Sequence, residues 1–428
     1  MRDSLTVLAS ILIAALTLAL VGPWFVDWTA RRGFIEAQLS QALGAPVATR
    51  GAISLALLPT PRLELGGVSL GEGGPVSLRT GAVRFELAVT ALLHGELRFL
   101  DVSLNEPEIR VSLDGAGALP TMPDAGALPE VQFERIAITG GKLTLVDPAS
   151  GALTISGLDL QAEAASLNGP FRGAGSMARD GERLGFRFST GAREGERLRL
   201  KFVSDEAAGL PRIDVDGALL LGASPGFEGP FIASGKRPAP WRAVGVAKLD
   251  VARLLLEPVE LRLGTDAAPI TLSGTAQFAL GPEPVGQITL AARQIDLDKV
   301  IGLEKAMVDQ TSAPGLEGAF RAWLGDAGAP LSAPFPLRIS LTSPATYLGG
   351  ETISDLALEA SLAPGAPMGL RASGSGPGRL RVALDGQVET GSAFRFKGQA
   401  AAEARDLARL GDWIAPALPQ VAATLRAA

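Results

Sequence analysis

The sequence predicts a mainly β protein: an N-terminal transmembrane helix followed by a long, curled antiparallel β-sheet that forms an apolar groove, with a few short helices. Three observations lead to this fold class. An uncharged apolar run lies near the N-terminus, apolar and polar residues alternate with a period of two after residue 44, and short polar segments separate the alternating stretches. Such a run suits a membrane span, and repeated strands joined by short turns indicate an antiparallel meander.

The composition excludes several classes of protein. The 428 residues include 52 Gly and 30 Pro but only one Tyr, one His and no Cys. Without Cys the chain has no disulfides, iron–sulfur clusters or thiolate zinc sites. The formal net charge of −6 argues against a nucleic-acid partner, because phosphate contacts require a basic surface. We expect no cofactor.

The first predicted element is a transmembrane anchor. From Leu5 to Val26 the chain has 22 residues without a charge, and about 20 are needed to cross a bilayer. A cleaved signal peptide is the alternative, but this run exceeds the usual apolar core of about 7 to 15 residues. The flanking arginines lie on both sides of the run and leave its orientation open. The predicted anchor residues are Leu5, Leu8, Ile11, Leu12, Leu16, Leu20, Trp24 and Trp28, of which the tryptophans favour the headgroup layer.

A short amphipathic helix is expected next. Ile35, Leu39 and Leu43 recur at i, i+4 and i+8, and Gly44 follows at the position where glycine often ends a helix. Such a helix either caps the first strands of the fold or lies on the membrane surface, and both roles are compatible.

The stretch "GAISLALLPTPRLELGGVSLG", residues 51–71, reads as two strands interrupted by two prolines. Pro59 and Pro61 have no N–H to donate, so they belong at a strand end, a bulge or a sheet edge.

The alternation continues along most of the chain and predicts strands with one apolar and one polar face. In "LRLKF", for example, Arg199 and Lys201 separate three apolar residues. The residues predicted to line the apolar groove are Leu143, Leu145, Leu198, Leu200, Phe202, Leu261, Leu263, Ile270, Leu272, Leu337, Ile339, Leu341, Leu380, Val382 and Leu384.

A continuous apolar face has to be buried against helices, a second sheet or something that is not protein. The predicted helices are too few, and a sheet with roughly 20 or more strands exceeds the usual limit of about 10, so it has to curl or split. A curled sheet leaves a leucine-lined trough suited to acyl chains. A compact barrel or sandwich is the alternative.

We predict four regions along the chain. Segments rich in Gly and Pro at 114–130 and 236–241 are candidate boundaries, and a short helical patch is expected over 297–310. The C-terminal region has no evident closing segment, which leaves open whether the chain is complete or part of a longer protein. The regions are a transmembrane anchor (1–27), an N-terminal region with the short helix and the start of the groove (28–125), a repeating antiparallel β-groove (126–402) and a short helical tail (403–428).

No motif indicates catalysis or a metal site. His94 is the only histidine and has no partner at a catalytic or metal-binding spacing, so we predict a turn or surface residue. Asp296 and Asp298 lack further oxygen ligands and fit a solvated strand end. The "GSGPG" at 374–378 lacks the Lys and Ser or Thr of a phosphate loop and fits a turn. The sequence therefore predicts a protein that is not an enzyme.

Several segments together resemble the AsmA family of Gram-negative envelope proteins. They are "LSQALGAPVATRGAISLALLPTPRLELGGVSLG", "LLHGELRFLDVSLNEPEIRV" and "ITGGKLTLVDPASGALTISGLDLQAEAASLNGPF", and the resemblance is strongest up to residue 208. It implies a single-pass inner-membrane anchor, a grooved β-structure in the periplasm, a part in outer-membrane homeostasis and passage of phospholipid between membranes. It also links the family to outer-membrane protein assembly.

The preferred hypothesis is a membrane-anchored protein that conducts or holds phospholipid acyl chains in an apolar β-groove. The alternative is a non-enzymatic envelope assembly factor that contacts outer-membrane or other envelope proteins and closes its apolar face on itself. The expected partners are phospholipid, the inner membrane and such envelope proteins, with no nucleic acid.

Overall fold

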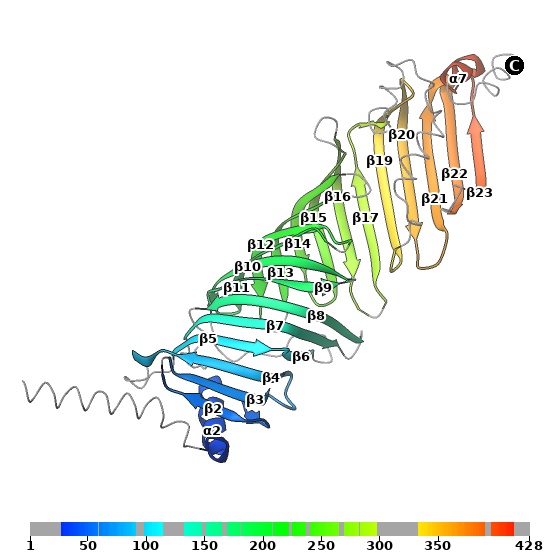
Figure 1. The fold of residues 1–428 in the computed structure, drawn as a ribbon. Coiled ribbons are helices and arrows are strands. Elements are labelled where there is room, and N and C mark those ends of the chain that lie inside the picture. The colour runs from blue at the N-terminus through cyan, green and yellow to red at the C-terminus, as the bar shows by residue number, and fades with distance from the viewer. Residues whose placement is uncertain are drawn as a thin grey trace, which may run out of the picture. The chain divides into compact units, whose positions relative to one another are not determined.

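The computed structural model describes two compact units, Met1–Phe227 and Glu228–Ala428. In the part of the chain that it describes, 23 strands belong to one mixed sheet and helices are few (Figure 1). The mainly β prediction is therefore confirmed, whereas the predicted domain limits stay predictions. The described residues are 27–58, 60–90, 98–113, 132–147, 151–164, 169–179, 181–207, 209–221, 225–236, 240–264, 269–281, 283–297, 333–389 and 395–414.

The described part of unit 1 starts with a 3-10 turn and an α-helix and continues as strands. Its elements are η2 (Thr29–Arg31), α2 (Arg32–Leu43), β1 (Val47–Thr49), β2 (Ile53–Ala56), β3 (Arg62–Leu70), β4 (Val76–Leu87), β5 (Arg98–Asn105), β6 (Glu108–Ser112), β7 (Gln132–Asp147), β8 (Gly151–Ala164), β9 (Phe171–Arg179), β10 (Glu182–Glu194), β11 (Arg197–Ser204) and β12 (Arg212–Leu220). Strand β13 (Gly226–Gly235) contains the division between the units.

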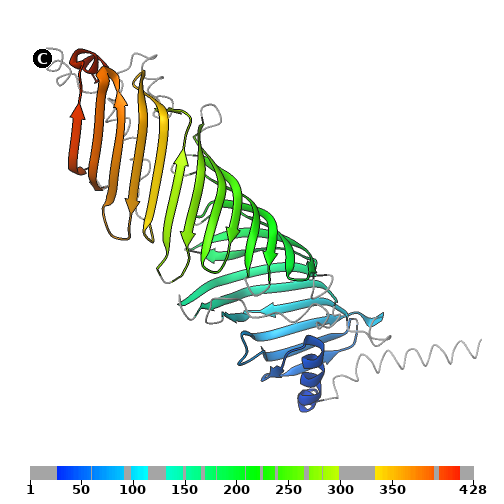
Figure 2. The ribbon, with the colours of Figure 1, turned by 180° about the vertical axis from the view of Figure 1, so that it is seen from behind.

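Unit 2 contains the remaining described strands, and its last described element is a helix. Its elements are β14 (Trp241–Leu249), β15 (Arg253–Leu263), β16 (Ile270–Ala279), β17 (Val285–Ala291), β18 (Ile295–Asp296), β19 (Leu337–Leu348), β20 (Glu351–Leu362), β21 (Met368–Gly376), η4 (Pro377–Arg379), β22 (Leu380–Glu389), β23 (Arg395–Glu403) and α7 (Leu407–Ile414). In each unit the described strands form a single layer, with α2 beside the first strands of unit 1 (Figure 1, Figure 2).

The predicted purely antiparallel pairing is wrong at two places. Strand β7 runs parallel to β5 and β6, and β19 runs parallel to β17 and β18. Parallel neighbours start at the same end of the sheet, so the chain has to return across it through a connection of about a dozen or more residues. The segments 113–131 and 297–336 lie between the strands concerned and are long enough. All other described pairings are antiparallel, as expected of short turns.

The predicted helix at residues 35–43 is confirmed as α2, and it caps the first strands. Leu39 is buried and Ile35 and Leu43 pack against the same cluster, which also contains Leu65 and Val68 of the proline-interrupted stretch. Gly44 ends the helix with a left-handed φ of 67°. In residues 51–71, α2 and the neighbouring strands therefore bury Ile53, Leu65 and Val68, whereas Leu57 stays exposed.

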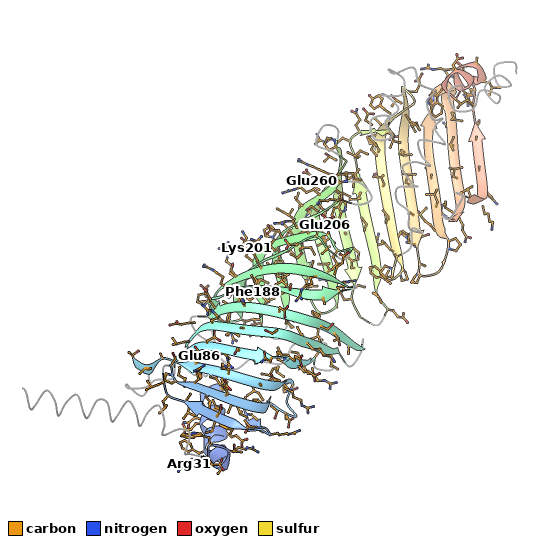
Figure 3. All side chains as sticks on the ribbon, in the orientation of Figure 1. Arg31, Glu86, Phe188, Lys201, Glu206 and Glu260 are labelled. Carbon is orange, nitrogen blue, oxygen red and sulfur yellow. The ribbon has the colours of Figure 1, made fainter. Side chains whose placement is uncertain are left out.

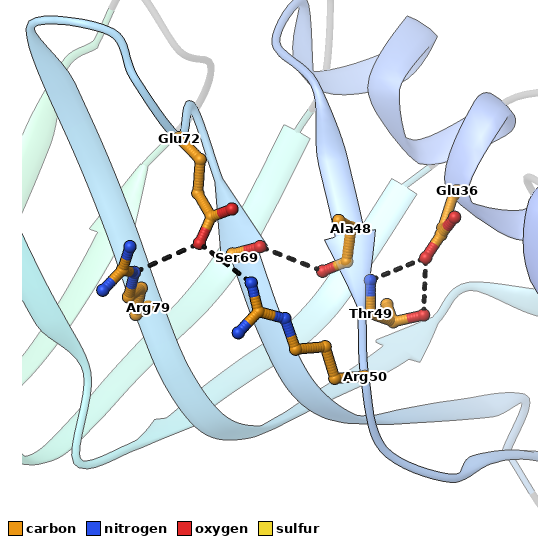
Figure 4. Close-up of polar contacts among 7 residues, drawn as sticks. All are labelled: Glu36, Ala48, Thr49, Arg50, Ser69, Glu72 and Arg79. Atoms are coloured by element: carbon orange, nitrogen blue, oxygen red, sulfur yellow. Dashed lines mark hydrogen bonds and ion pairs between the residues drawn. The ribbon is translucent and has the colours of Figure 1, made fainter.

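A polar contact fixes α2 to β1. The Glu36 carboxylate accepts hydrogen bonds from the backbone N of Thr49 at 2.6 Å and from its hydroxyl at 2.8 Å (Figure 4). Thr49 is buried, so these bonds satisfy donors that water does not reach. Ser40 of α2 also accepts a hydrogen bond from the backbone N of Val47 at 2.9 Å, and Arg32 donates one to the Gly51 carbonyl at 2.9 Å, so packing and four hydrogen bonds hold the helix.

The predicted transmembrane run lies at residues 5–26, outside the described residues. Among the residues that the structure does describe, no helix has the length and apolar character needed to cross a membrane. Trp28 is described, and its ring packs against the cluster formed with α2. Its predicted place in the headgroup layer stays a prediction, as does the helical patch at 297–310, of which only Leu297 is described.

Candidate functional site

The sheet has two chemically different faces. On β11, Leu198, Leu200 and Phe202 are half-buried while Arg199 and Lys201 are exposed. The same alternation holds on β22, where the even-numbered side chains from 380 to 384 turn inward. Successive side chains of a strand point to opposite faces, so the predicted period of two is confirmed as one apolar and one polar face.

Unit 2 brings five of the predicted apolar residues together. In the register of the sheet Leu261 lies opposite Leu272, and Leu263 lies opposite Ile270. They share one cluster with Leu341 of β19 and with the buried residues Leu290, Ala292 and Ile295. Leu337 and Ile339 lie on the same strand as Leu341, and Leu380, Val382 and Leu384 lie on β22; none of these five belongs to the cluster.

In unit 1 the predicted residues lie on β7 and β11. Leu143 is opposite Ile109 and Ile155, so β6, β7 and β8 contribute to one apolar row. Leu145 is opposite Val111 of β6. On β11 the three predicted residues continue across β10 and β12, where Phe202 meets Phe188 on one side and Val215 on the other.

Apolar residues on intervening strands extend the apolar face beyond the residues predicted from the sequence. Phe186 of β10 stacks on Phe202 with ring centroids 6.0 Å apart. In β9, a Cβ added at Gly175 would lie 2.9 Å from the Phe186 ring, so glycine leaves the space that the ring occupies. The "FRF" of β10 and the "QITL" of β17 carry the same alternation and could have been found by it.

Most of the apolar face is only half covered. Of the predicted residues, Leu272 and Leu380 are buried at 4% and 8% exposure, and the others are half-buried. In the described part of each unit, one layer of strands is present and the helices α2 and α7 lie at its ends (Figure 1, Figure 2). The central part of the apolar face therefore has unburied hydrophobic area among these residues.

Ion pairs connect neighbouring strands on the polar face. Arg84 contacts Glu64 at 2.8 Å, and Arg371 contacts Asp385 at 3.0 Å and Glu359 at 3.5 Å. The hydrogen bond to Asp385 and the two nearby carboxylates raise the pKa of Arg371. Figure 3 shows the side chains that both faces carry.

Asp159 shows how strongly one carboxylate of this face is held. It accepts a hydrogen bond from the backbone N of Gly140 at 2.9 Å and another from Arg183. The Gly140 bond, and then the charge of Arg183, hold the pKa of Asp159 below its usual value. The carboxylate ties β8 to the bulge in β7 and to β10.

The residues weighed for catalysis form no common site. His94 and Asp298 lie outside the described residues, and Asp296 is on the two-residue strand β18. The 374–378 segment is the end of β21 followed by the turn η4, in which Pro377 and Gly378 are buried. Within the described ranges no group of three or more His, Asp or Glu side chains could hold a metal ion.

The fold and its faces define a class: large β-sheet proteins with one apolar face and one charged face. Residues 1–182 match the model of the AsmA family, and this match supports the resemblance predicted from the sequence. The matched part ends at the first residue of β10. No curated protein and no solved structure matches the chain. AsmA proteins are generally associated with the cell envelope and are not known as enzymes.

Proposed function

We propose that this protein is anchored in the inner membrane by residues 5–26, lies mainly in the periplasm and carries phospholipid acyl chains along its apolar face. In this role it serves outer-membrane homeostasis and catalyses no reaction. The match to the AsmA family model and the large β-sheet are consistent with a part in lipid transfer within the envelope.

The observation that carries the proposal is the half-covered apolar face. Leucines on β15, β16 and β19 share one cluster, yet Leu261, Leu263 and Leu341 keep part of their surface exposed. Covering the side chain of a leucine is worth about 1.5–3 kcal/mol when it is fully removed from water. An acyl chain laid across several half-buried leucines gains a fraction of that amount at each of them.

The opposite face of the same sheet is charged and suits contact with water. Its ion pairs, such as Arg262 with Glu260 at 2.8 Å, keep that side in water. A sheet with one solvated face and one apolar face holds acyl chains on the apolar face alone, so the lipid does not have to cover both faces. We also propose that the sheet curls and forms a trough around these acyl chains.

A photo-crosslinking experiment tests it. A benzophenone amino acid is placed at Leu263 or, one residue away on the polar face, at Arg262 of the full chain in intact cells. Crosslinked phospholipid is expected from position 263 and not from 262. Crosslinks to protein from both positions, without lipid, would instead support the envelope assembly factor.

A further inference from the structure

Unit 1 has a hollow on its polar face in which positive charge is not neutralised. The hollow has a volume of about 480 Å³, within the usual range for small-ligand sites of roughly 300–1,000 Å³. Four cations from four strands line it: Arg135 of β7, Arg172 of β9, Arg187 of β10 and Lys201 of β11. We call it the cationic hollow.

The register of the sheet places three of these cations around one hydroxyl. Ser189 of β10 lies directly between Arg172 and Lys201, opposite both. Arg187 lies two residues away on the same strand and therefore on the same face. Neighbouring strands are about 4.8 Å apart, so Arg172 and Lys201 flank a point above Ser189 within reach of their long side chains. Figure 3 labels Lys201 and, on the neighbouring strand β10, Phe188.

Among the described residues, three of these cations have no acidic side chain in ion-pair contact, although Asp216 of β12 lies opposite Lys201 in the register. Arg172, Arg187 and Lys201 make no ion pair within the described residues, whereas Arg199, on the same strand and face as Lys201, contacts Asp216 at 3.3 Å. Arg135 is held at 3.6 Å from Asp101. The one carboxylate lining the hollow is Glu163, opposite Arg172 in the register.

Two other hollows show that this excess is specific. In unit 1, a hollow lined by Arg50, Arg79 and Lys142 also contains three glutamates, and one of them, Glu72, contacts Arg50 at 3.6 Å and Arg79 at 3.2 Å (Figure 4). In unit 2, a hollow around Arg371 contains both of its carboxylate partners. Charge is balanced in those places and unbalanced in the cationic hollow.

We propose that the cationic hollow binds a phosphate group. Two guanidinium forks and an ammonium around a hydroxyl match the several oxygens and the charge of a phosphate better than those of a single carboxylate. The phosphate belongs either to a free phosphate compound or to a lipid headgroup. The site lies on the face opposite the apolar one, so it does not depend on the proposed function.

Protection of Lys201 from acetylation tests the proposal. The full chain is reconstituted in phosphatidylcholine nanodiscs and treated with an acetylating reagent, and the rate at each lysine is measured by mass spectrometry. Inorganic phosphate is added in one arm, against chloride at equal ionic strength; in the second arm a third of the lipid is phosphatidylglycerol. With phosphate at about ten times its dissociation constant, acetylation of Lys201 should slow about tenfold, because about nine sites in ten are filled. Lys248, paired with Glu228, is the internal control.

A double variant shows whether the hollow is responsible. Arg172→Gln with Arg187→Gln keeps Lys201 but removes two guanidinium groups, and it should abolish the protection. Arg84→Gln removes an exposed arginine of the polar face that is paired with Glu64 and does not line the hollow, and it should leave the protection intact. An unchanged melting temperature shows that each variant is folded.

The two arms identify the source of the phosphate. Protection by inorganic phosphate assigns a free phosphate compound, and protection by phosphatidylglycerol alone assigns a lipid headgroup. Absence of protection in both arms, or protection that survives in the double variant, would overturn the proposal. Because the readout is at Lys201, failure of lipid transfer on the other face would not change it.

Discussion

Gly157 of β8 and Asp355 of β20 hold the same left-handed backbone conformation at the same step of a bulge. Their φ angles are 61° and 56°. They occupy the fourth position of "TISGLDL" and "TISDLAL", and the register shifts between Ser156 and Asp159 in one strand and between Ser354 and Ala357 in the other. Each of these strands also follows one that pairs in parallel, so the two units repeat one arrangement of strand and bulge.

Gly157→Ala should destabilise unit 1. A left-handed φ costs a residue with a Cβ about 1–2 kcal/mol, and the added Cβ would lie 2.9 Å from the Cβ of Ala178. Asp355→Gly, at the matching position, should change the stability by no more than about 1 kcal/mol, because lost strain and added chain entropy oppose each other. Urea denaturation followed by circular dichroism measures both. A Gly157→Ala protein as stable as the wild type would contradict the prediction.

Leu263→Glu should lower phospholipid occupancy while the protein remains folded. Leu263 is half-buried on the apolar face, so the carboxylate lies in the path of an acyl chain but can still reach water. Thr271→Glu is the control on the polar face, where the new acid lies opposite Arg262. Copurified phospholipid and melting temperature are measured on both. Full lipid occupancy in a folded Leu263→Glu protein would speak against acyl chains on this face.

Leu272→Glu should behave differently from Leu263→Glu. Leu272 is 4% exposed at the centre of the unit 2 cluster, so the charge is buried among apolar side chains. We expect a loss of several kcal/mol and a marked fall in melting temperature, with loss of lipid following from unfolding. Equal melting temperatures for the two variants would mean that the cluster does not exclude water.

Glu36→Ala should loosen α2 from the sheet. It leaves the buried backbone N and hydroxyl of Thr49 without their acceptor, which costs about 1–3 kcal/mol. Glu36→Gln keeps an acceptor oxygen and should lose less. Hydrogen exchange of the α2 and β1 amides is the measurement, with β11 amides as the internal reference. Exchange in Glu36→Ala equal to that of the wild type would show that the Glu36 bonds do not hold the helix.

Asp159 should make the stability of unit 1 depend on pH in the acid range. Its pKa is lower in the folded chain than in the unfolded one, so its stabilising contribution is complete above the unfolded value of about 3.9 and is lost as the pH falls through the folded value. Asp159→Asn should lack this component. Melting temperatures from pH 6 down to pH 2 test it; parallel curves for the two proteins would rule it out.

The sequence by itself determined the faces of the strands and the first helix. Side chains alternate along any extended chain, so the spacing of Leu198, Leu200 and Phe202 puts them on one face whatever the partners are. The period of Ile35, Leu39 and Leu43, with Gly44 after them, likewise predicts α2 from local geometry. Both features depend on residues within a few positions of one another.

Only the tertiary structure decided which strands pair in parallel and which charges meet. A backbone forms hydrogen bonds with neighbours of either direction, so the alternation on β7 does not say that β5 and β6 run alongside it. The segments before β7 and β19 are too long for a hairpin turn, and this length was the sequence signal for a parallel connection. In the cationic hollow, Arg135 of β7 and Lys201 of β11 are separated by four strand pairings. Whether an arginine lies near an acid there depends on the register of each pairing, which no local sequence pattern encodes.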